Sequence, residues 1–477
     1  MATELYGVEA VVGASQASTP VSNATNLIFY GTAASGAVGE PILISGWADA
    51  VEKLGCASGD GYTLTDACLA AFQECNLKQI YVIPVANSLS PADSAYTNAM
   101  LNIADLWLKY GIIGNIFCAP RVQDAAIISA LVTAAQKQDG KFNGVVVFDG
   151  IQDEDQIDMA GRPIISAITS SSVKTSSNKI CICQWGYAHL KSGDVVSGAA
   201  LRACRLALAD MQNAGSLPSR CSGNLDIDIQ AACIWAREKD ITHTAAIDND
   251  HVKITLTDTA YAAYNGDLLV EYTLHPTEGS DVSKSETVTF TAGIGVCSFD
   301  TSSLTSPEVS ASHAYLLGYV DINAKEADLT QLSADGIDSF LNIGGGQYVT
   351  WGDHSAAFAN GTISDEAGRF DNYMRMMYHI TNRFQHKYRN VIDEKLTLKL
   401  RNDILSEEND YLGLIVSQGA LIGSPRCVFS EAENSSETAQ KGEFYFEDVI
   451  TITPPAKYIK LKVIFSSEGY IVYQEAA

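Results

Sequence analysis

Short apolar runs alternate with amphipathic stretches through the first half of the chain. The runs have the length of strands and occupy residues 26–31, 41–45, 79–86, 114–120, 144–150 and 179–185. Helical spacing of apolar residues fills most of the intervals, at residues 64–76, 92–111 and 123–138, and again at 197–215 after the last run. Continuous apolar strands that alternate with amphipathic helices are typical of a parallel sheet covered on both faces. The pattern predicts a doubly wound α/β domain over residues 26–240.

The pattern changes at about residue 241. Residues 251–258, 267–276 and 285–293 are rich in β-branched and aromatic side chains and are separated by turn residues. Helical spacing is absent from this stretch. A small antiparallel β domain over residues 241–303 is therefore expected.

Residues 304–477 return to a mixed pattern. An apolar stripe at helical spacing predicts a helix within 366–388, and its members are Phe370, Tyr373, Met377, Ile380 and Phe384. A second helical stretch covers 397–421. Near the end of the sequence Ile459, Leu461, Val463 and Phe465 are spaced to lie on one strand face, with Lys460 and Lys462 on the other, which predicts a strand.

Both ends of the sequence have the composition of short extended segments. The first 25 residues hold Leu5, Val8, Val11 and Val12 in a strand-like run followed by a polar stretch. The last ten residues contain a second such run, made of Tyr470, Ile471, Val472 and Tyr473. Chain ends are usually loose unless they are tied into a sheet, so both ends are interpreted as arms.

The charge balance limits the classes of partner. The sequence has 31 Lys and Arg against 56 Asp and Glu, which gives a formal net charge of −25. A surface this acidic repels phosphate, so we expect no direct binding of nucleic acid and no docking on anionic membranes. No apolar stretch is long enough to cross a membrane, and no targeting segment is expected. The 11 Cys are sparse and odd in number, which favours free thiols in a reducing cytoplasm.

A search for catalytic and ligand-binding motifs leaves only isolated candidates. No phosphate-binding loop or nucleophile elbow is present, and Gly344 to Gly346 are interpreted as a turn before a strand. His379 and His386 share a helix face without a third ligand, and Cys181 and Cys183 fit small buried side chains. Acidic residues gather at 153–158, 226–228 and 248–250 without calcium-loop spacing, so they are interpreted as solvated loops. We therefore expect no catalytic residue, no cofactor and no metal.

An ordered series of motifs runs through the C-terminal third. Residues 328–356 hold a glycine-containing segment that leads to a V-x-W-G element, and a helix with Arg369 follows. Residues 418–434 and 442–465 then carry G-A-L-x-G, an Asn-containing turn, a strand and P-P-A-x-Y-I. In these motifs and their order the sequence resembles the contractile bacteriophage tail sheath proteins. At the other end, residues 5–15 and 26–55 resemble the opening segments of that family.

The resemblance implies an architecture and a role. A conserved sheath domain would form from residues 1–25 together with 304–477, with the α/β domain of 26–240 inserted and residues 241–303 as a surface domain. The two arms would add as strands to sheets of neighbouring subunits, which assigns an inter-subunit role to Leu5, Val8, Val11, Val12 and Tyr470 to Tyr473. Subunits would stack as rings around a tube in a metastable extended state and contract to drive the tube through a host envelope.

The implied partners and location follow from that role. The partners would be further copies of the chain, a tail tube protein, and baseplate and tail terminator proteins. The place would be a virion tail assembled in a bacterial cytoplasm. The sheath of a phage-derived bacteriocin or injection particle fits the same residues. A cytosolic α/β enzyme or ligand-binding protein is the alternative from another class, and it predicts a pocket at the carboxyl ends of the sheet strands.

Overall fold

The computed structural model describes residues 25–101, 106–136, 138, 142–171, 178–299 and 304–468. The chain forms two compact units, Met1–Ile404 and Leu405–Ala477. The predicted arm residues all lie outside the described ranges, and they are Leu5, Val8, Val11, Val12, Tyr470, Ile471, Val472 and Tyr473.

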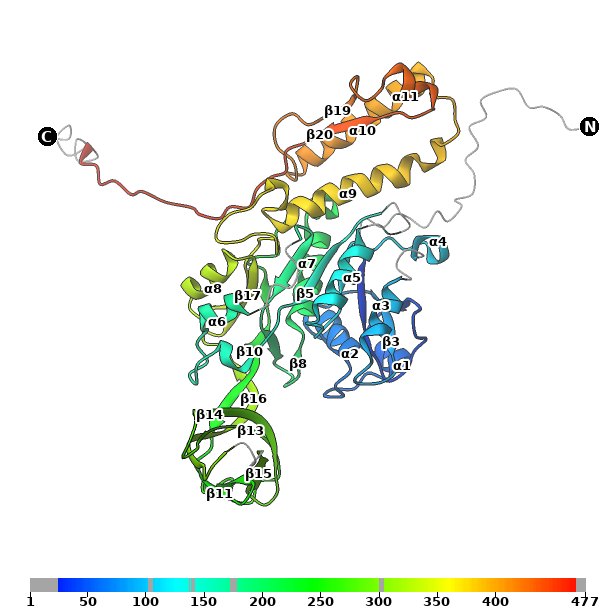
Figure 1. The fold of residues 1–477 in the computed structure, drawn as a ribbon. Helices are drawn as coiled ribbons and strands as arrows, with labels where there is room; N and C mark the ends of the chain where they lie inside the picture. The colour runs from blue at the N-terminus through cyan, green and yellow to red at the C-terminus, as the bar shows by residue number, and fades with distance from the viewer. Residues whose placement is uncertain are drawn as a thin grey trace, which may run out of the picture. The chain divides into compact units, whose positions relative to one another are not determined.

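A nine-stranded sheet forms the centre of the first unit, in the order β2-β3-β1-β4-β5-β6-β17-β18-β9 (Figure 1). In that order the strands are Ile42–Ile44, Ile80–Ala86, Leu27–Thr32, Ile116–Cys118, Val145–Asp149, Cys181–Gln184, Ile337–Gly344, Gln347–Trp351 and Asp226–Ile227. The strands from β3 to β17 in this order are parallel, whereas β2 runs antiparallel to β3, β18 to β17 and β9 to β18. Most residues of β1, β4, β5 and β6 are buried, as expected for strands covered on both faces. The α/β class expected from the sequence is what the structure shows.

Helices follow the strands of this sheet in the predicted alternation. They are α1 (Trp47–Leu54), α2 (Thr63–Cys68) continued by the π-helix η1 (Leu69–Glu74), α3 (Asp93–Leu101), α4 (Leu106–Tyr110), α5 (Ala125–Ala135), α6 (Ile165–Ser170), α7 (Gly198–Gln212), α8 (Glu326–Ser333) and α9 (Asp371–Tyr388). Helix α7 begins where the Ser197 hydroxyl accepts a hydrogen bond from the Ala200 amide, a typical N-cap. In helix α7, 11 of the 15 residues are buried, because most of its side chains lie against the sheet.

Two strands from the C-terminal stretch 304–477 extend the same sheet. Strand β17 pairs in parallel with β6, with Ile337 opposite Cys183 and Asp338 opposite Gln184. Strand β18 returns antiparallel to β17 after the turn at Gly344 to Gly346, where all three residues have positive φ. The three glycines are therefore a hairpin turn before a strand, as the sequence analysis expects.

A six-stranded sheet carries the chain from the central sheet into the β domain, in the order β14-β13-β16-β10-β7-β8. Its strands in that order are Val282–Phe290, Gly266–His275, Glu308–Asp321, Ile229–Asp240, Tyr187–Leu190 and Val195–Val196. A three-stranded sheet of β11 (His243–Asp248), β12 (His251–Leu256) and β15 (Ile294–Ser298) completes the domain. The predicted strands at 251–258, 267–276 and 285–293 correspond to β12, β13 and β14. A separate core, which includes Val270, Tyr272 and Phe290, lies between the two sheets.

The second unit is small. Helix α10 (Leu398–Ser417) crosses the boundary between the units, and β19 (Arg426–Phe429), α11 (Ser436–Gln440) and β20 (Phe446–Val449) follow it. The strand predicted at 459–465 is not formed, since residues 453–466 are in neither a helix nor a strand. A strand needs a neighbour for its backbone groups, and no described strand of the same chain supplies one. None of the helices in the described ranges is both long and apolar enough to span a bilayer.

Candidate assembly site

Residues 458–465, called the C-terminal arm below, carry a run of large apolar side chains on the surface. Six are exposed by 70% or more, and they are Tyr458, Ile459, Leu461, Val463, Ile464 and Phe465. A single exposed apolar side chain is ordinary on a soluble protein, but a run of this density marks an interaction site. Every second residue from Ile459 to Val463 is apolar, with Lys460 and Lys462 between them. In an extended backbone, Ile459, Leu461, Val463 and Phe465 therefore lie on one face, and Lys460 and Lys462 lie on the other between Tyr458 and Ile464.

Two prolines explain why the arm is extended. Pro454 and Pro455 lack a backbone N–H, and their rings hold φ near the value of extended or polyproline structure. The residue before each proline is also disfavoured in a helix. The Thr453 amide donates to the Ala420 carbonyl, so the chain is held by backbone pairing up to that point. Figure 1 draws residues 454–466, in red, as a thin line without helix or strand.

The arm continues from a two-stranded antiparallel ribbon. Strands β19 and β20 pair with Arg426 opposite Val449 and Phe429 opposite Phe446. Beyond β20 a further backbone hydrogen bond joins the chain to the segment before β19, from the Ile422 amide to the Thr451 carbonyl. With only two strands, each has an outer edge that no described strand covers. Such an edge can template the addition of another strand.

The side chain of Asn409 distinguishes the two edges. The Cys427 amide donates to Asn409 Oδ1 at 3.0 Å, and Asn409 Nδ2 donates to the Cys427 carbonyl at 3.1 Å. The carboxamide thus occupies the outward N–H and C=O of β19, as a neighbouring strand would. Strand addition is therefore favoured at the outer edge of β20.

The two faces of the ribbon differ in chemistry. Phe446 and Phe429 meet with their rings at 5.3 Å, and Phe446 and Asp448 are half-buried. Glu447 and Val449, which alternate with them, are exposed. Glu447 has no ion-pair partner among the described residues, and the same holds for Lys460 and Lys462. A strand on the β20 edge would consequently meet an aromatic inner face and an acidic outer face.

At the carboxyl ends of β4 and β5, where doubly wound folds bind ligands, side chains of the chain itself form an ion pair and hydrogen bonds. The Arg121 guanidinium, just beyond β4, bonds to Asp66, and its Nη1 donates to the Tyr319 hydroxyl at 2.7 Å. The Ser197 hydroxyl donates to Asp149 Oδ2 at 2.6 Å at the end of β5. Burial raises the pKa of Asp66 to about 6, and the Arg121 cation opposes that shift. These buried contacts hold α2, α7 and the sheet together.

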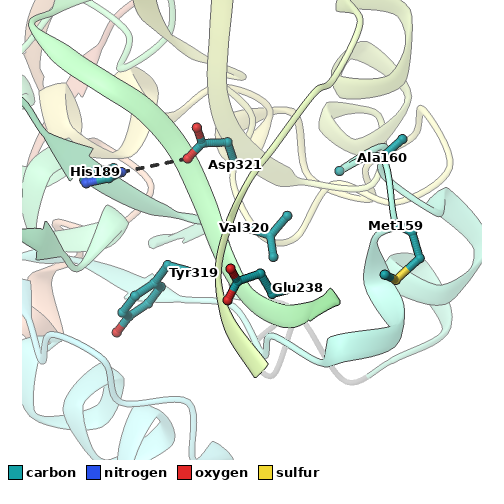
Figure 2. A pocket seen from close by; sticks show the side chains of 8 residues that line it. Met159, Ala160, His189, Glu238, Tyr319, Val320 and Asp321 are labelled. Carbon is teal, nitrogen blue, oxygen red and sulfur yellow. Dashed lines mark ion pairs between the residues drawn. The ribbon is translucent and has the colours of Figure 1, made fainter. Parts of the chain in front are cut away.

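An open pocket of about 460 Å³ lies at the foot of the β10–β16 ladder, and Figure 2 shows its lining. The lining residues are Met159, Ala160, Gly161, His189, Glu238, Tyr319, Val320 and Asp321. His189 Nδ1 is 3.8 Å from Asp321 Oδ1, longer than a hydrogen bond. No residue of β1 or β4 contributes to it. The enzyme or ligand-binding alternative requires a pocket, and this is one. Its position is not the one that the doubly wound fold predicts.

The remaining candidates from the sequence serve local structure. Burial, assisted by the Arg383 cation, lowers the pKa of His379 to about 4, and burial and Arg389 lower the pKa of His386. In the acidic clusters, Asp155 pairs with Arg237 and Asp228 with Lys191. Within the part of the chain that the structure covers, no group of three or more His, Cys, Asp or Glu side chains is arranged to hold a metal ion.

All 11 cysteines fall within the described ranges, and every one is buried and free. Cys181 and Cys183 lie in β6 as the small buried side chains that the sequence predicts. Burial and the neighbouring Asp448 carboxyl raise the pKa of Cys427, so even the thiol nearest the ribbon edge is unreactive.

Solved structures show which fold the chain shares. At 14% sequence identity and a TM-score of 0.56, it is similar to a chain of the anti-feeding prophage (AFP) baseplate, and the match covers 98% of this chain and 100% of that one. At 11% identity and a TM-score of 0.56, it is similar to the sheath complex of PVC, an extracellular contractile injection system, in the contracted state, over 98% and 99% of the two chains. A sheath tail protein from Listeria innocua matches at 11% identity and a TM-score of 0.46, over 90% and 95%.

These neighbours are sheath proteins of contractile injection systems, in agreement with the resemblance seen in the sequence. No protein family profile matches the sequence, and no curated protein matches it. The shared property is the fold, because the identities are low.

Sequence reasoning found the apolar alternation of the arm but missed the site that would receive it. The role of β20 depends on Asn409, which lies 18 residues before the backbone groups that it occupies. An isolated Asn in an amphipathic helix carries no signal of such a contact. The chosen arm residues also lay closer to the chain ends than the exposed segment 458–465.

Proposed function

We propose that the chain is a structural subunit of a contractile sheath. Copies would polymerise as a helical tube around a tube protein, remain in a metastable extended state, and contract to drive that tube through a host envelope. The fold supports this, because the likeness to the AFP and PVC chains extends over 98% of the sequence.

The exposed C-terminal arm is the observation that carries the proposal. It holds a run of exposed apolar side chains outside any helix or strand, next to a two-stranded ribbon whose β20 edge no described strand covers. Added to the β20 edge of a second copy, the arm would gain backbone hydrogen bonds that each contribute about 0.5–1.5 kcal/mol net. Links of this kind are individually weak and add up along a polymer.

The proposed arms also include residues beyond the described ranges. Leu5, Val8, Val11 and Val12 at one end, and Tyr470, Ile471, Val472 and Tyr473 at the other, would lengthen the paired segments. Strand pairing fits a contracting structure, because a paired strand can move with its neighbour while the linker bends. The Pro454–Pro455 junction and the residues around it would serve as that linker.

The energy for contraction would be stored at assembly. Copies with a net charge of −25 repel one another, so an extended lattice held by arm links has further apolar surface to bury when it packs more tightly. Such a release needs no nucleotide, as in other switches that use stored strain. A tail tube protein, a baseplate and a terminator protein are the partners that we propose.

Electron microscopy of the purified chain tests the assembly. We expect long tubes from the intact protein and discrete particles from a chain that ends at Lys457. The double variant Leu461→Asp/Val463→Asp should also fail to form tubes, because two charges would enter the apolar face of the added strand. Leu108→Asp is the matched control, since Leu108 is 77% exposed but lies on α4. It should form tubes like the unmodified protein.

Tubes from the truncated chain would contradict the role of the arm. Discrete monomers from the intact chain at all concentrations, or turnover of a substrate by the purified protein, would favour the α/β enzyme alternative instead.

Two kinds of particle remain candidates, a phage virion tail and a phage-derived injection particle. The AFP and PVC neighbours come from a prophage-derived particle and an extracellular injection system, and these names favour the second kind. Purified particles separate the two, because virions carry DNA-filled capsids and injection particles do not.

A further inference from the structure

The C-terminal arm is basic although the chain as a whole is strongly acidic. Lys460 and Lys462 lie on the face opposite Ile459 and Leu461, and no acidic residue occurs between Val449 and Glu468. The charged side chains on this face of the arm are therefore all positive.

The β20 edge has the opposite sign. Glu447 stands at the second position of the strand with its side chain on the exposed outer face, and Glu443 precedes the strand on the same connection. Between Arg426 and Lys457 the only basic residue is Lys441, against six acidic ones. Glu447 is thus the exposed carboxylate next to the backbone groups that an added strand would pair with.

The apolar side chains and the charges of the arm favour the same orientation of its two faces on the ribbon. With its apolar face turned to the inner side of the ribbon, the arm sets Ile459, Leu461 and Val463 beside Phe446. The lysines then lie on the outer side beside Glu447. A slip of one residue would exchange the faces and put ammonium groups against the aromatic side chain. A slip by an even number of residues keeps the faces, and two such placements, two residues apart, put a lysine opposite Glu447.

We propose that Lys460 and Lys462 of one copy pair across strands with Glu447 of a second copy, and that these pairs limit the arm to two registers on the β20 edge. This inference rests on the proposed sheath function. In each of these two registers, one lysine lies opposite Glu447 and the other diagonal to it, within reach of a long side chain. The charges restrict the register, while apolar burial and backbone bonds hold the strand.

The arm that occupies the edge belongs to another copy because of the proline junction. Only four residues separate Val449 from Pro454, and the chain remains paired to Ala420 up to Thr453. Folding back onto its own β20 would require a tight reversal at two consecutive prolines, which favour an extended course.

The critical concentration for polymerisation, measured by pelleting at a fixed ionic strength, tests the pairing. Lys460→Glu/Lys462→Glu should raise it about tenfold, because favourable cross-strand pairs become repulsive ones. Glu447→Lys should raise it several-fold for the same reason. Lys253→Glu/Lys284→Glu in the β domain is the control, since it changes the net charge equally and should have a smaller effect.

Mixing the two variants provides the decisive measurement. Arms with lysines would meet Glu447 of the first variant, and arms with glutamates would meet the new lysine of the second. We expect equimolar mixtures to polymerise within about twofold of the unmodified chain. The triple variant Lys460→Glu/Lys462→Glu/Glu447→Lys carries both changes in one chain. Failure of the mixture while this triple variant polymerises would overturn the assignment to a second copy.

A double variant that polymerises like its control would overturn the charge pairing. The proposed sheath function would still be supported if the unmodified chain forms tubes and the chain truncated at Lys457 does not. Absence of tubes from the unmodified chain would instead contradict both.

Discussion

Gly352 shows how one residue of the V-x-W-G element is determined by its surroundings. Its φ is +96°, and a Cβ there would come 1.9 Å from Asp338 Oδ1. Its carbonyl accepts a hydrogen bond from Arg202, which is fully buried and also pairs with Asp338. The sequence showed the motif, but the reason for the glycine lies in the contact between β17, β18 and α7.

We expect Gly352→Ala to lower the free energy of unfolding by about 2–5 kcal/mol, from the unfavourable positive φ and the overlap with Asp338. Gly46→Ala is the control, because a Cβ at Gly46 meets nothing within 4 Å and its φ of 161° is ordinary extended backbone. It should change stability by less than about 1 kcal/mol. Urea unfolding followed by tryptophan fluorescence measures both, and equal effects would contradict the role of Gly352.

His379 makes the stability depend on pH. Its folded pKa of about 4 lies below the ordinary value of 6.5, so the folded state requires the neutral ring. The stabilisation is fully present above pH 6.5 and is lost as the pH falls from 6.5 towards 4, because the unfolded chain binds the proton first.

The unmodified protein should therefore lose more stability than His379→Gln between pH 7 and pH 5. The difference between the two proteins at each pH isolates this histidine from buried carboxyls such as Asp66, whose raised pKa acts in the opposite direction. A difference that does not change with pH would show that His379 is not the group responsible.

Segments with strong apolar periodicity form the predicted helices and strands. Segments with weak periodicity, or without a strand to pair with, do not. Helix α7 and the strands of the β domain follow the expected ranges, because their apolar spacing meets a core in the same chain. In α9 the predicted stripe is only partly right. Ile380 is buried, but Met374 and Met376 are more buried than Tyr373 and Met377. The strand predicted at 459–465 is not formed, because no described strand of the chain pairs with it.

The ribbon should depend on Asn409. Asn409→Ala removes one donor and one acceptor from the Cys427 backbone, which leaves the β19 edge open. We expect a loss of about 1–3 kcal/mol in the stability of this unit, and irregular aggregates in addition to tubes. Asn402→Ala, whose side chain bonds only its neighbour Arg401, is the control among the contacts described. Thermal unfolding and electron microscopy compare the two, and ordered tubes alone from Asn409→Ala would contradict the blocking role.

For the whole molecule, net charge governs the association between copies. A formal charge of −25 gives long-range repulsion that acts before the short-range strand pairing can form. Added salt screens this repulsion, with a Debye length of about 10 Å at 0.1 M. The local attraction of Lys460 and Lys462 for Glu447 is screened too, but it involves far fewer charges.

The critical concentration for polymerisation should therefore fall when NaCl rises from about 0.02 to about 0.15 M. Pelleting across a salt series measures it. A rise with salt would mean that attraction between charges, rather than apolar burial and backbone pairing, holds the copies together.

Because the thiols are buried, we expect the assembled protein to run as a monomer on non-reducing gels.

The sequence by itself determined the α/β class, the β domain and the acidic character, because local periodicity and composition do not depend on a partner. It also carried the sheath resemblance and the alternation of the arm. Only the tertiary structure decided that β17 joins the central sheet, that Arg121 fills the strand ends and that Asn409 leaves β20 as the open edge. These features arise from contacts between residues far apart in the chain, and spacing along a single sequence does not encode such contacts.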